Sequence, residues 1–453
     1  ILPLSIPRPR LAALIANHLF IDIPPISNAM LAMSHPLDNV PSLPHVCFMD
    51  YEVIIAGGGL NGLTLALALD QVGICTAVID RQTTASMKLS GFDGRSYALS
   101  AASKKMLSVL DVWPSLARNA EPMLEIKVTD GQAGAAPSPF MMEFRQEDMP
   151  EGPMGYVVED RHLRLALFDA IKRSSVTHLP SENIISHDIE FAQVSVTLGD
   201  KSCLQAPLLV GADGRASQIA KDAGIARAGW AYEQSSLVCA IQHEKPHNNI
   251  AHQYFMSAGP LAILPLSGNR SGIVWTEKTE TAQTINALDD AAYLEILQPR
   301  FGNFLGKISL AGNRYTYPLS LSTTYSMISQ RLALVGDAAH AVHPIAGQGL
   351  NAGFKDVAAL AEVLCNARRR GQDLGVQTAL EEYQRWRRFD NAILSLATNG
   401  FNRLFSNDNP ISRGLRDLGM GLINNSHSIR RAFVANAAGT AGEVPKLMQG
   451  SRL

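Results

Sequence analysis

The sequence predicts an α/β fold, in which a domain built on a parallel sheet is split by a mostly antiparallel β-sheet domain and followed by C-terminal helices. Two observations predict the parallel sheet: a strand, a glycine-rich loop and a helix follow one another near residue 51, and again near residue 331. A third predicts the antiparallel sheet, because strand-like segments separated by turn residues fill most of positions 225–330.

The composition is that of an ordinary globular protein with two sizeable cores. The chain has 453 residues, of which 46% are hydrophobic and 18% are charged. A formal net charge of −2 argues against a nucleic-acid partner, and no apolar run reaches the roughly 18 residues of a membrane span. The five cysteines form no Cys-x-x-Cys pair, so the sequence favours a reducing compartment and no zinc site. His340 and His343 lack the further ligands that would complete a metal site.

The first glycine-rich loop lies between a predicted strand, Tyr51–Ala56, and a strongly apolar helix, Leu63–Val72. It reads GGGLNG, which is G-x-G-x-x-G in the context that dinucleotide-binding proteins require. Gly57 permits the tight turn, Gly59 lets a pyrophosphate approach the backbone, and Gly62 lets the helix pack on the strand.

Two acidic residues follow later strands of the same unit. The predicted strand Cys75–Ile79 ends at Asp80, where a carboxylate would meet an adenosine ribose. A predicted strand over Leu204–Val210 leads into Gly-Ala-Asp-Gly, which places Asp213 at the carboxyl edge of the sheet, near the ligand. The unit predicts a dinucleotide but not which one. An NAD-dependent dehydrogenase is the alternative that this unit alone would favour.

The second strand–loop–helix junction indicates which dinucleotide binds. Arg331–Val335 is a predicted buried strand, Asp337 follows it directly, and a helix with a regular apolar face begins at Gln348. Asp337 can accept hydrogen bonds from ligand hydroxyls, and the positive end of the helix would stabilise the negative charge of a reduced flavin. Residues that leave bare backbone for a flat ring lie between them: Pro344, Gly347 and Gly349. The junction therefore predicts a flavin.

Other elements are less specific. The polar loop 82–97 contains Arg95, which would either neutralise a pyrophosphate or pair with a surface carboxylate, and spacing alone leaves both open. Helices are predicted over Ala98–Leu110, over Arg161–Lys172 and at about 289–299.

With GGGLNG, the Asp213-Gly214 pair and the Gly336-Asp337 pair in this order, the chain resembles the single-component FAD-dependent aromatic hydroxylases, which have the fold of para-hydroxybenzoate hydroxylase. The resemblance runs from about residue 51 to the C-terminus. Within that group, GPLAILPL at 259–266, YPLSL at 317–321 and the HPIAGQGLN run look like the ubiquinone-biosynthesis hydroxylases.

The resemblance implies a role for each candidate site residue. The pyrophosphate of FAD would lie on Gly57, Gly59 and Gly62, the adenosine ribose on Asp80, and the ribityl chain on Asp337. Further FAD contacts would come from Arg95, Arg161, Asp213 and Gly336. The isoalloxazine would lie beside Pro344, Gly347, Gln348, Gly349, Leu350 and Asn351. The chain departs from the family at Ala220, which is followed by Lys221, where relatives commonly carry an Arg. This departure weakens the case for a pyridine-nucleotide contact at that turn.

The resemblance also implies the domain order. Residues 1–48 begin with Ile1, are rich in proline and are expected to be a disordered or mis-assigned extension. The expected parts are FAD-binding segments at 49–122, 159–224 and 331–371, substrate-domain segments at 123–158 and 225–330, and a helical region at 372–453.

The implied reaction is hydroxylation of the aromatic ring of a polyprenylated phenol through a flavin C4a-hydroperoxide, with O₂ and with electrons from NAD(P)H or a protein donor. Such a substrate fits a cytoplasmic enzyme, with attachment to the inner membrane or to a ubiquinone-biosynthesis complex. An apolar sheet would exclude water and fit the polyprenyl tail, and its residues are also those of an ordinary sheet core: Leu261, Ile263, Leu264 and Trp275. His252, Tyr232 and Tyr254 are better explained as structural residues than as a general base. The alternatives are a small soluble aromatic substrate and a flavin-binding assembly subunit without turnover.

Overall fold

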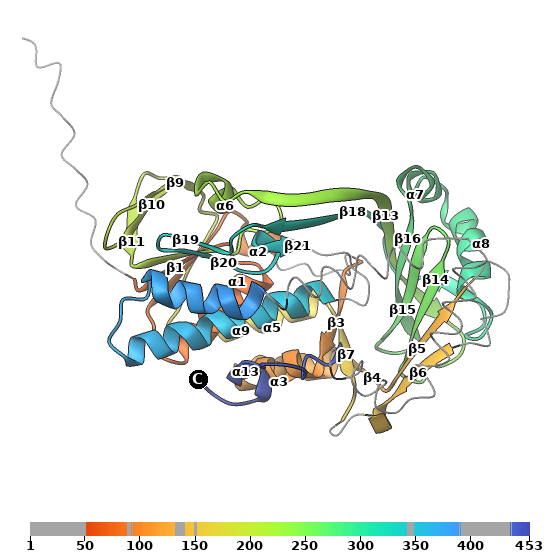
Figure 1. Ribbon diagram of the computed structural model, residues 1–453. Coiled ribbons are helices and arrows are strands. Elements are labelled where there is room, and N and C mark those ends of the chain that lie inside the picture. The colour runs from red at the N-terminus through yellow and green to blue at the C-terminus, as the bar shows by residue number, and fades with distance from the viewer. Residues whose placement is uncertain are drawn as a thin grey trace, which may run out of the picture. The chain divides into compact units, whose positions relative to one another are not determined.

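The computed structural model describes residues 51–87, 92, 94–131, 141–148, 152–341, 348–388, 390, 435 and 437–453. The N-terminal segment 1–48, together with His343, Pro344 and Gly347, therefore lies outside the described residues. The described residues form an α/β fold, as predicted (Figure 1).

The three glycine junctions are the turns at Gly57–Gly62, Gly211–Gly214 and Gly336–Asp337, and each lies at the end of a strand in a six-stranded sheet. Its order is β19-β20-β12-β1-β2-β8, and all neighbouring strands are parallel except the edge pair β19–β20. The strands are β1 (Val53–Ala56), β2 (Thr76–Asp80), β8 (Thr177–Pro180), β12 (Leu208–Gly211), β19 (Ile328–Ser329) and β20 (Leu332–Leu334). Because Ala56, Gly211 and Leu334 stand side by side in register, the chain leaves β1, β12 and β20 at one edge of the sheet.

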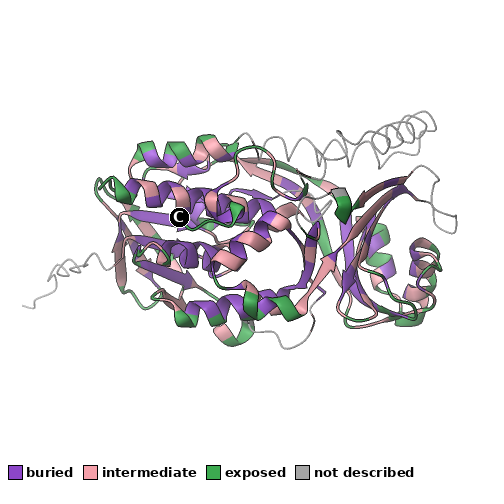
Figure 2. Ribbon diagram, turned by 90° about the horizontal axis from the view of Figure 1, so that it is seen from below, coloured by how far each residue is buried: buried purple, intermediate pink, exposed green. Residues whose placement is uncertain are grey.

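Helices pack against this sheet. Helix α1 (Leu60–Asp70) contacts α5 (Asp160–Arg173) and α9 (Gln348–Arg369), which begins at the residue the sequence predicted. Strand residues and the inward helix faces are buried together (Figure 2). Shorter helices are α2 (Thr84–Met87), α4 (Trp113–Leu116), α6 (Gln218–Asp222) and α13 (Lys446–Gln449), and residues 377–388 are also helical.

Two sequence-based boundaries were wrong. Leu204–Val210 is not one strand, because Pro207 separates β11 (Cys203–Ala206) from β12. Strand β11 belongs to a three-stranded sheet with β9 (Ile184–Ile189) and β10 (Val194–Leu198). The predicted helix Ala98–Leu110 starts three residues too early.

Residues Ser96–Ser100 instead form β3, which pairs with β7 (Gly155–Glu159), and β7 also pairs with β4 (Ala120–Met123). Helix α3 (Ala101–Val109) begins only after Ser100, whose side chain accepts a hydrogen bond from the Ser103 amide and so caps the helix. The serine cap therefore sets the true start of the helix.

A second large sheet has nine strands and is antiparallel except where β14 meets β5. Its order is β21-β18-β13-β16-β15-β14-β5-β6, with β17 beside β13. The strands are β5 (Glu125–Asp130), β6 (Met141–Arg145), β13 (Arg227–His243), β14 (Ile250–Met256), β15 (Gly259–Leu266), β16 (Arg270–Lys278), β17 (Ile308–Leu310), β18 (Tyr315–Thr324) and β21 (His340–Ala341). Strands from residues 125–145 and 227–341 therefore share one sheet.

One face of this sheet packs against α7 (Thr279–Asn286) and α8 (Asp290–Phe301). The sequence predicted α8 but missed α7, whose eight mostly polar residues bury only Ala282 and Ile285. Trp275 lies in this helix-facing core, with its ring centroid 6.1 Å from that of Tyr293 and the Arg300 guanidinium 4.9 Å from its centroid.

The prediction that apolar sheet residues shield the substrate needs correction. Leu261, Ile263 and Trp275 are at most 1% exposed and belong to the helix-facing core, so they form an ordinary sheet interior. Leu264 lies on the opposite face, where it packs against Met123 and Val157.

We expect Trp275→Phe to destabilise the protein by about 2 kcal/mol, because it leaves a cavity between the sheet and α8. Trp230→Phe is the matched control, since Trp230 is 45% exposed. Urea unfolding measures the difference, and flavin content at full occupancy should be the same in both variants. Loss of flavin in folded Trp275→Phe protein would contradict the assignment of Trp275 to the helix-facing core.

Candidate active site

The three glycine junctions meet at the carboxyl edge of the six-stranded sheet. A Cβ on Gly57 would lie 3.0 Å from the Cα of Asp213 and would collide with the carbonyl of Ala212. A Cβ on Gly336 would collide with the side chain of Asn61 in the first turn of α1. Backbone approaches this close require glycine, and Gly57 and Gly336 also have positive φ angles of 112° and 59°. The sheet therefore gathers all three junctions around one space.

The N-terminus of α1 fits a pyrophosphate. Gly59 is its N-cap residue, no side chain caps the helix, and its first turn contains no acidic residue. A Cβ on Gly59 would meet nothing within 4 Å, whereas a Cβ on Gly62 would collide with the Gly57 carbonyl. Free amides at a helix N-terminus with open space before them bind phosphate groups.

Asp80 links this turn to the end of β2. Its two carboxylate oxygens accept hydrogen bonds from the amides of Gly58, at 2.6 Å, and Gln82, at 2.7 Å. Each oxygen keeps a further lone pair, so the carboxylate can still accept a bond from a ribose hydroxyl.

Asp337 stands at the end of β20 with its side chain 45% exposed and its Oδ2 3.9 Å from Nη2 of Arg215. Its backbone is held from below, because the Arg227 guanidinium donates to the carbonyls of Asp337, at 3.1 Å, and Ala338, at 2.5 Å. The backbone of Asp337 is thus held in place, while its carboxylate remains accessible to a ligand.

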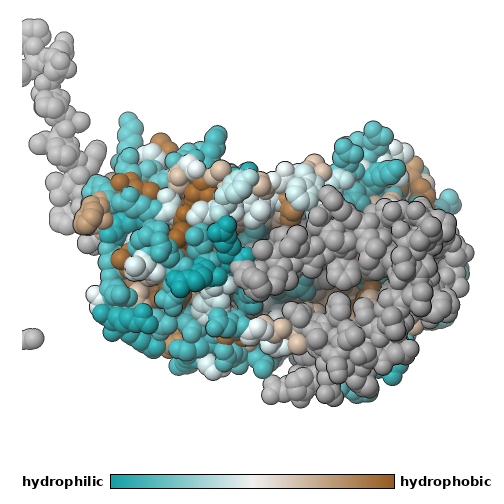
Figure 3. All heavy atoms as spheres, viewed as in Figure 1, coloured by the Kyte–Doolittle hydropathy of each residue, from teal (hydrophilic) through white to brown (hydrophobic). Residues whose placement is uncertain are grey.

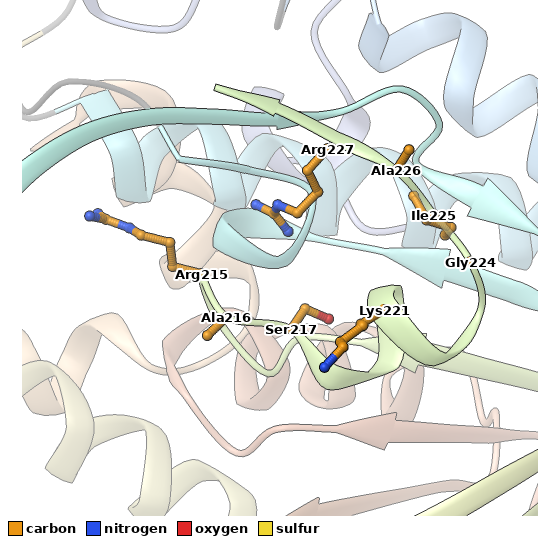
Figure 4. A pocket seen from close by; sticks show the side chains of 8 residues that line it. All are labelled: Arg215, Ala216, Ser217, Lys221, Gly224, Ile225, Ala226 and Arg227. Atoms are coloured by element: carbon orange, nitrogen blue, oxygen red, sulfur yellow. The ribbon is translucent and has the colours of Figure 1, made fainter. Parts of the chain in front are cut away.

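A basic cavity of about 490 Å³ opens beside this junction (Figure 4). Arg215, Lys221 and Arg227 supply its charge. Burial lowers the pKa of the Arg227 guanidinium, an effect that Asp337 and Asp213 oppose. The Asp213 carboxylate is engaged at 2.8 Å as an acceptor from the Gln218 amide at the start of α6. Asp213 therefore orders this turn.

Arg95 and Arg161 both face acidic residues at the β7–α5 boundary. Arg95 lies 3.2 Å from Asp160 and Arg161 lies 2.6 Å from Glu159. Arg95 therefore pairs with a carboxylate, one of the two roles that its spacing left open, but the Asp160 side chain is fully buried and does not lie at the surface. Tyr97 donates a hydrogen bond to Asp160 at 2.9 Å, and burial together with this carboxylate raises the pKa of the Tyr97 hydroxyl.

The first turn of α9 contains Gln348, Gly349 and Leu350, each partly exposed, which the resemblance predicts to lie beside the isoalloxazine. A Cβ on Gly349 would meet nothing within 4 Å, and the turn carries no acidic residue. Asn351 is buried, and its amide group holds three groups of β3 and α3: the Ser100 amide at 3.0 Å, the Ser103 hydroxyl at 2.8 Å and the Ala98 carbonyl at 2.8 Å. Its side chain thus anchors the helix.

Sequence reasoning missed Asp356, a fully buried residue of α9 that contacts the turn after β20. Its carboxylate accepts hydrogen bonds from Nε2 of His340 at 2.6 Å, the Gly336 amide at 3.0 Å and Nε of Arg387 at 2.8 Å. Burial alone would raise the pKa of Asp356, but the attraction of His340 and Arg387 outweighs it and the pKa is lowered. The only sequence signal was an Asp on the apolar side of a predicted helix.

The three residues considered as a general base lie elsewhere. His252 and Tyr254 point to the helix-facing side of the sheet, where the Phe304 ring centroid lies 4.7 Å from that of His252. Burial lowers the pKa of His252 to about 4 and raises that of Tyr254 to about 12. Tyr232 lies on β13 beside the Trp230 ring. In the described part of the chain, no three His, Cys, Asp or Glu side chains gather as a metal site.

Comparison with known proteins identifies the family. A family model described as an FAD binding domain matches residues 50–389. A ubiquinone hydroxylase of Rhodospirillum rubrum, UbiL, is 40% identical over 403 residues, covering 88% of this chain and 92% of its own. The chain belongs to the FAD-dependent ubiquinone-biosynthesis hydroxylases.

Other members and neighbours agree. The 3-demethoxyubiquinol 3-hydroxylase of Escherichia coli is 32% identical over 393 residues, covering 86% of this hydroxylase and 98% of its own chain. The crystal structure of p-nitrophenol 4-monooxygenase PnpA from Pseudomonas putida superposes with a TM-score of 0.72 at 16% identity, covering 87% of this hydroxylase and 99% of PnpA. The hydroxylase is therefore an FAD-dependent aromatic-ring monooxygenase with the predicted fold, and the dehydrogenase alternative is wrong.

Two glycine substitutions should separate folding from cofactor binding. We expect Gly62→Ala to destabilise the hydroxylase by about 3 kcal/mol, because its Cβ overlaps the Gly57 carbonyl. Gly59→Ala should fold normally yet bind FAD at least tenfold more weakly, because its Cβ occupies the open approach to the α1 amides. Flavin fluorescence titration and thermal melts measure both. Unchanged FAD affinity in Gly59→Ala would contradict the pyrophosphate position.

We expect Asp356→Asn to cost about 3 kcal/mol, because it removes one of the two carboxylates that pair with the buried Arg387, the other being Asp390 at 2.6 Å. The lowered pKa of Asp356 means that its contribution is present above the unfolded-state pKa and disappears as the pH falls through the folded-state pKa. Urea unfolding between pH 3 and 7 should therefore show a flatter acid limb in Asp356→Asn than in wild type. Asp188→Asn, at an exposed site on β9, is the control. Equal acid limbs in all three proteins would refute this role.

Proposed function

We propose that this protein hydroxylates the aromatic ring of a polyprenylated phenol in ubiquinone biosynthesis, with FAD as cofactor and O₂ as oxidant. The observation that carries the proposal is the meeting of three glycine junctions at one edge of the six-stranded sheet, together with a large antiparallel sheet whose face opposite α7 and α8 is turned toward the loop before β3. The names of the relatives support the substrate class.

The sheet face opposite α7 and α8 would receive the phenol. Residues paired across neighbouring strands share a face, and the register places Tyr315, Val238, Val274 and Ala262 in one row. A Cβ on Gly94 would lie 3.1 Å from Cε2 of Tyr315, so this row faces the loop that carries Arg95. The substrate would thus lie between this row and the flavin.

FAD, when bound, supplies the reduction of O₂ and the transfer of one oxygen atom to the ring. The chain's residues would hold and shield it. The α1 amides would bind the pyrophosphate, Asp80 and Asp337 would orient the two sugar chains, and Arg95 and Arg161 would add positive charge. The first turn of α9 would stabilise negative charge on the ring system through the positive end of the helix dipole. The apolar row would keep water from the reacting atoms.

The lipid substrate bears on where the protein works. No helix among the described residues is both long and apolar enough to cross a membrane. On the face shown in Figure 3, hydrophobic residues are scattered among hydrophilic ones. We infer peripheral association with the inner membrane, since a polyprenyl tail partitions into lipid. NAD(P)H and a protein donor remain the two candidate reductants.

The test is mass spectrometry of quinone lipids from the source organism, grown in air with the gene deleted and then restored as wild type or as Gly59→Ala. We expect the deletion to accumulate a prenylated phenol that lacks one ring oxygen, and wild type to reverse this more fully than the variant. Unchanged ubiquinone after deletion would contradict the proposal and favour a soluble aromatic substrate. Restoration by a protein that binds no FAD would instead support the assembly-subunit alternative.

A further inference from the structure

A histidine that the mechanism does not use lies beneath the first glycine-rich turn. His178 of β8 pairs in register with Val78 of β2, two residues before Asp80. Side chains two residues apart in a strand point to the same face, so His178 and Asp80 share one side of the sheet. A Cβ on Gly58 would lie 3.0 Å from Oδ2 of Asp80 and 3.3 Å from Nε2 of His178. The imidazole therefore lies against both the turn and the carboxylate.

The ring nitrogen that faces the turn has no protein partner. Nε2 of His178 is closed to solvent, and no hydrogen-bond partner for it lies within the part of the chain that the structure describes. A buried polar atom without a partner is costly and is uncommon in folded proteins. Phe168 of α5 packs its ring centroid 5.8 Å from that of His178, so the imidazole is held in this position by packing.

We propose that His178 is a positioning residue that couples uptake of a proton to FAD binding at the Gly57–Gly59 turn. The proposal rests on the placement of the FAD pyrophosphate proposed above. His178 does not touch the cofactor, because Nε2 is sealed from solvent, and it acts through the Gly58 backbone and Asp80. A protonated imidazole under the turn would add a positive charge where the pyrophosphate brings two negative ones.

The groups around the His178 ring determine whether its pKa is raised or lowered. Burial lowers the pKa of His178 and Asp80 of β2 opposes this, whereas α5 contributes the Phe168 ring and the turn contributes backbone. Bound pyrophosphate would raise the pKa again, so FAD binding and proton binding favour each other by equal amounts. FAD affinity should therefore be highest in acid and fall as the pH rises through the pKa of the FAD-bound state.

The experiment titrates FAD into the full-length apoprotein by flavin fluorescence from pH 5.5 to 8.5. We expect the wild-type Kd to rise about tenfold across this range, the change that one unit of pKa produces. His178→Gln and His178→Phe should both flatten the dependence, and the Phe variant preserves packing against Phe168. His187→Gln is the matched control, because His187 of β9 also has a buried ring nitrogen without a partner in the described structure but lies in a different sheet.

Titration calorimetry in two buffers of different ionisation enthalpy adds a direct count of protons. We expect wild type and His187→Gln to take up a fraction of a proton on binding FAD, and both His178 variants to take up none. That result would establish that proton uptake at His178 is coupled to FAD binding. A pH dependence that persists in His178→Phe would overturn the inference and leave the FAD site itself standing. Failure of wild type to bind FAD at any pH would instead overturn the proposed function.

Discussion

The buried carboxylate of Asp356 is the contact on which the second half of the FAD site depends. It joins three segments, since its partners are the Gly336 amide, His340 of β21 and Arg387 of the helical segment 377–388. The Gly336 bond fixes the turn that presents Asp337, and the position of Asp356 on α9 ties that turn to the helix proposed to face the flavin ring system. A displacement of this carboxylate would therefore move the proposed ribityl and ring contacts together.

A second charged cluster connects the nine-stranded sheet to the three-stranded β3-β7-β4 sheet and to α5. Glu159 at the end of β7 lies 3.0 Å from Arg270 of β16 and 2.6 Å from Arg161 of α5. The substrate-side sheet is thus ion-paired to the same carboxylate that holds a predicted FAD contact. Buried ion pairs contribute little net stability but are sensitive to geometry. Because Glu159 pairs with both Arg161 and Arg270, a change in its position would shift the two arginines together.

The sequence predicted the local parts of this site because each part is specified by residues close together in the chain. The G-x-G-x-x-G turn, Asp80 after β2 and the start of α9 all follow from such short patterns. Asn351 could not be assigned in this way, since its hydrogen bonds reach Ser100, 251 residues away. The nine-stranded sheet shows a different limit of sequence-based prediction. Alternation indicates that Leu261 and Ile263 share a face, but only the structure reveals that this face is covered by α7 and α8.

The departure from the family pattern at Ala220 has a structural explanation. Ala220 is fully buried in α6, and its amide donates a hydrogen bond to the Ser217 hydroxyl that caps the helix, so an arginine side chain there would have to leave the core to reach a ligand. Arg227 is committed to the backbone of Asp337 and Ala338, which leaves Arg215 and Lys221 as the exposed cations of the cavity. Exposed cations attract anions weakly and in a salt-dependent way. The glycine turns thus offer backbone groups suited to a phosphate, whereas the exposed cations of the cavity would hold an anion only weakly.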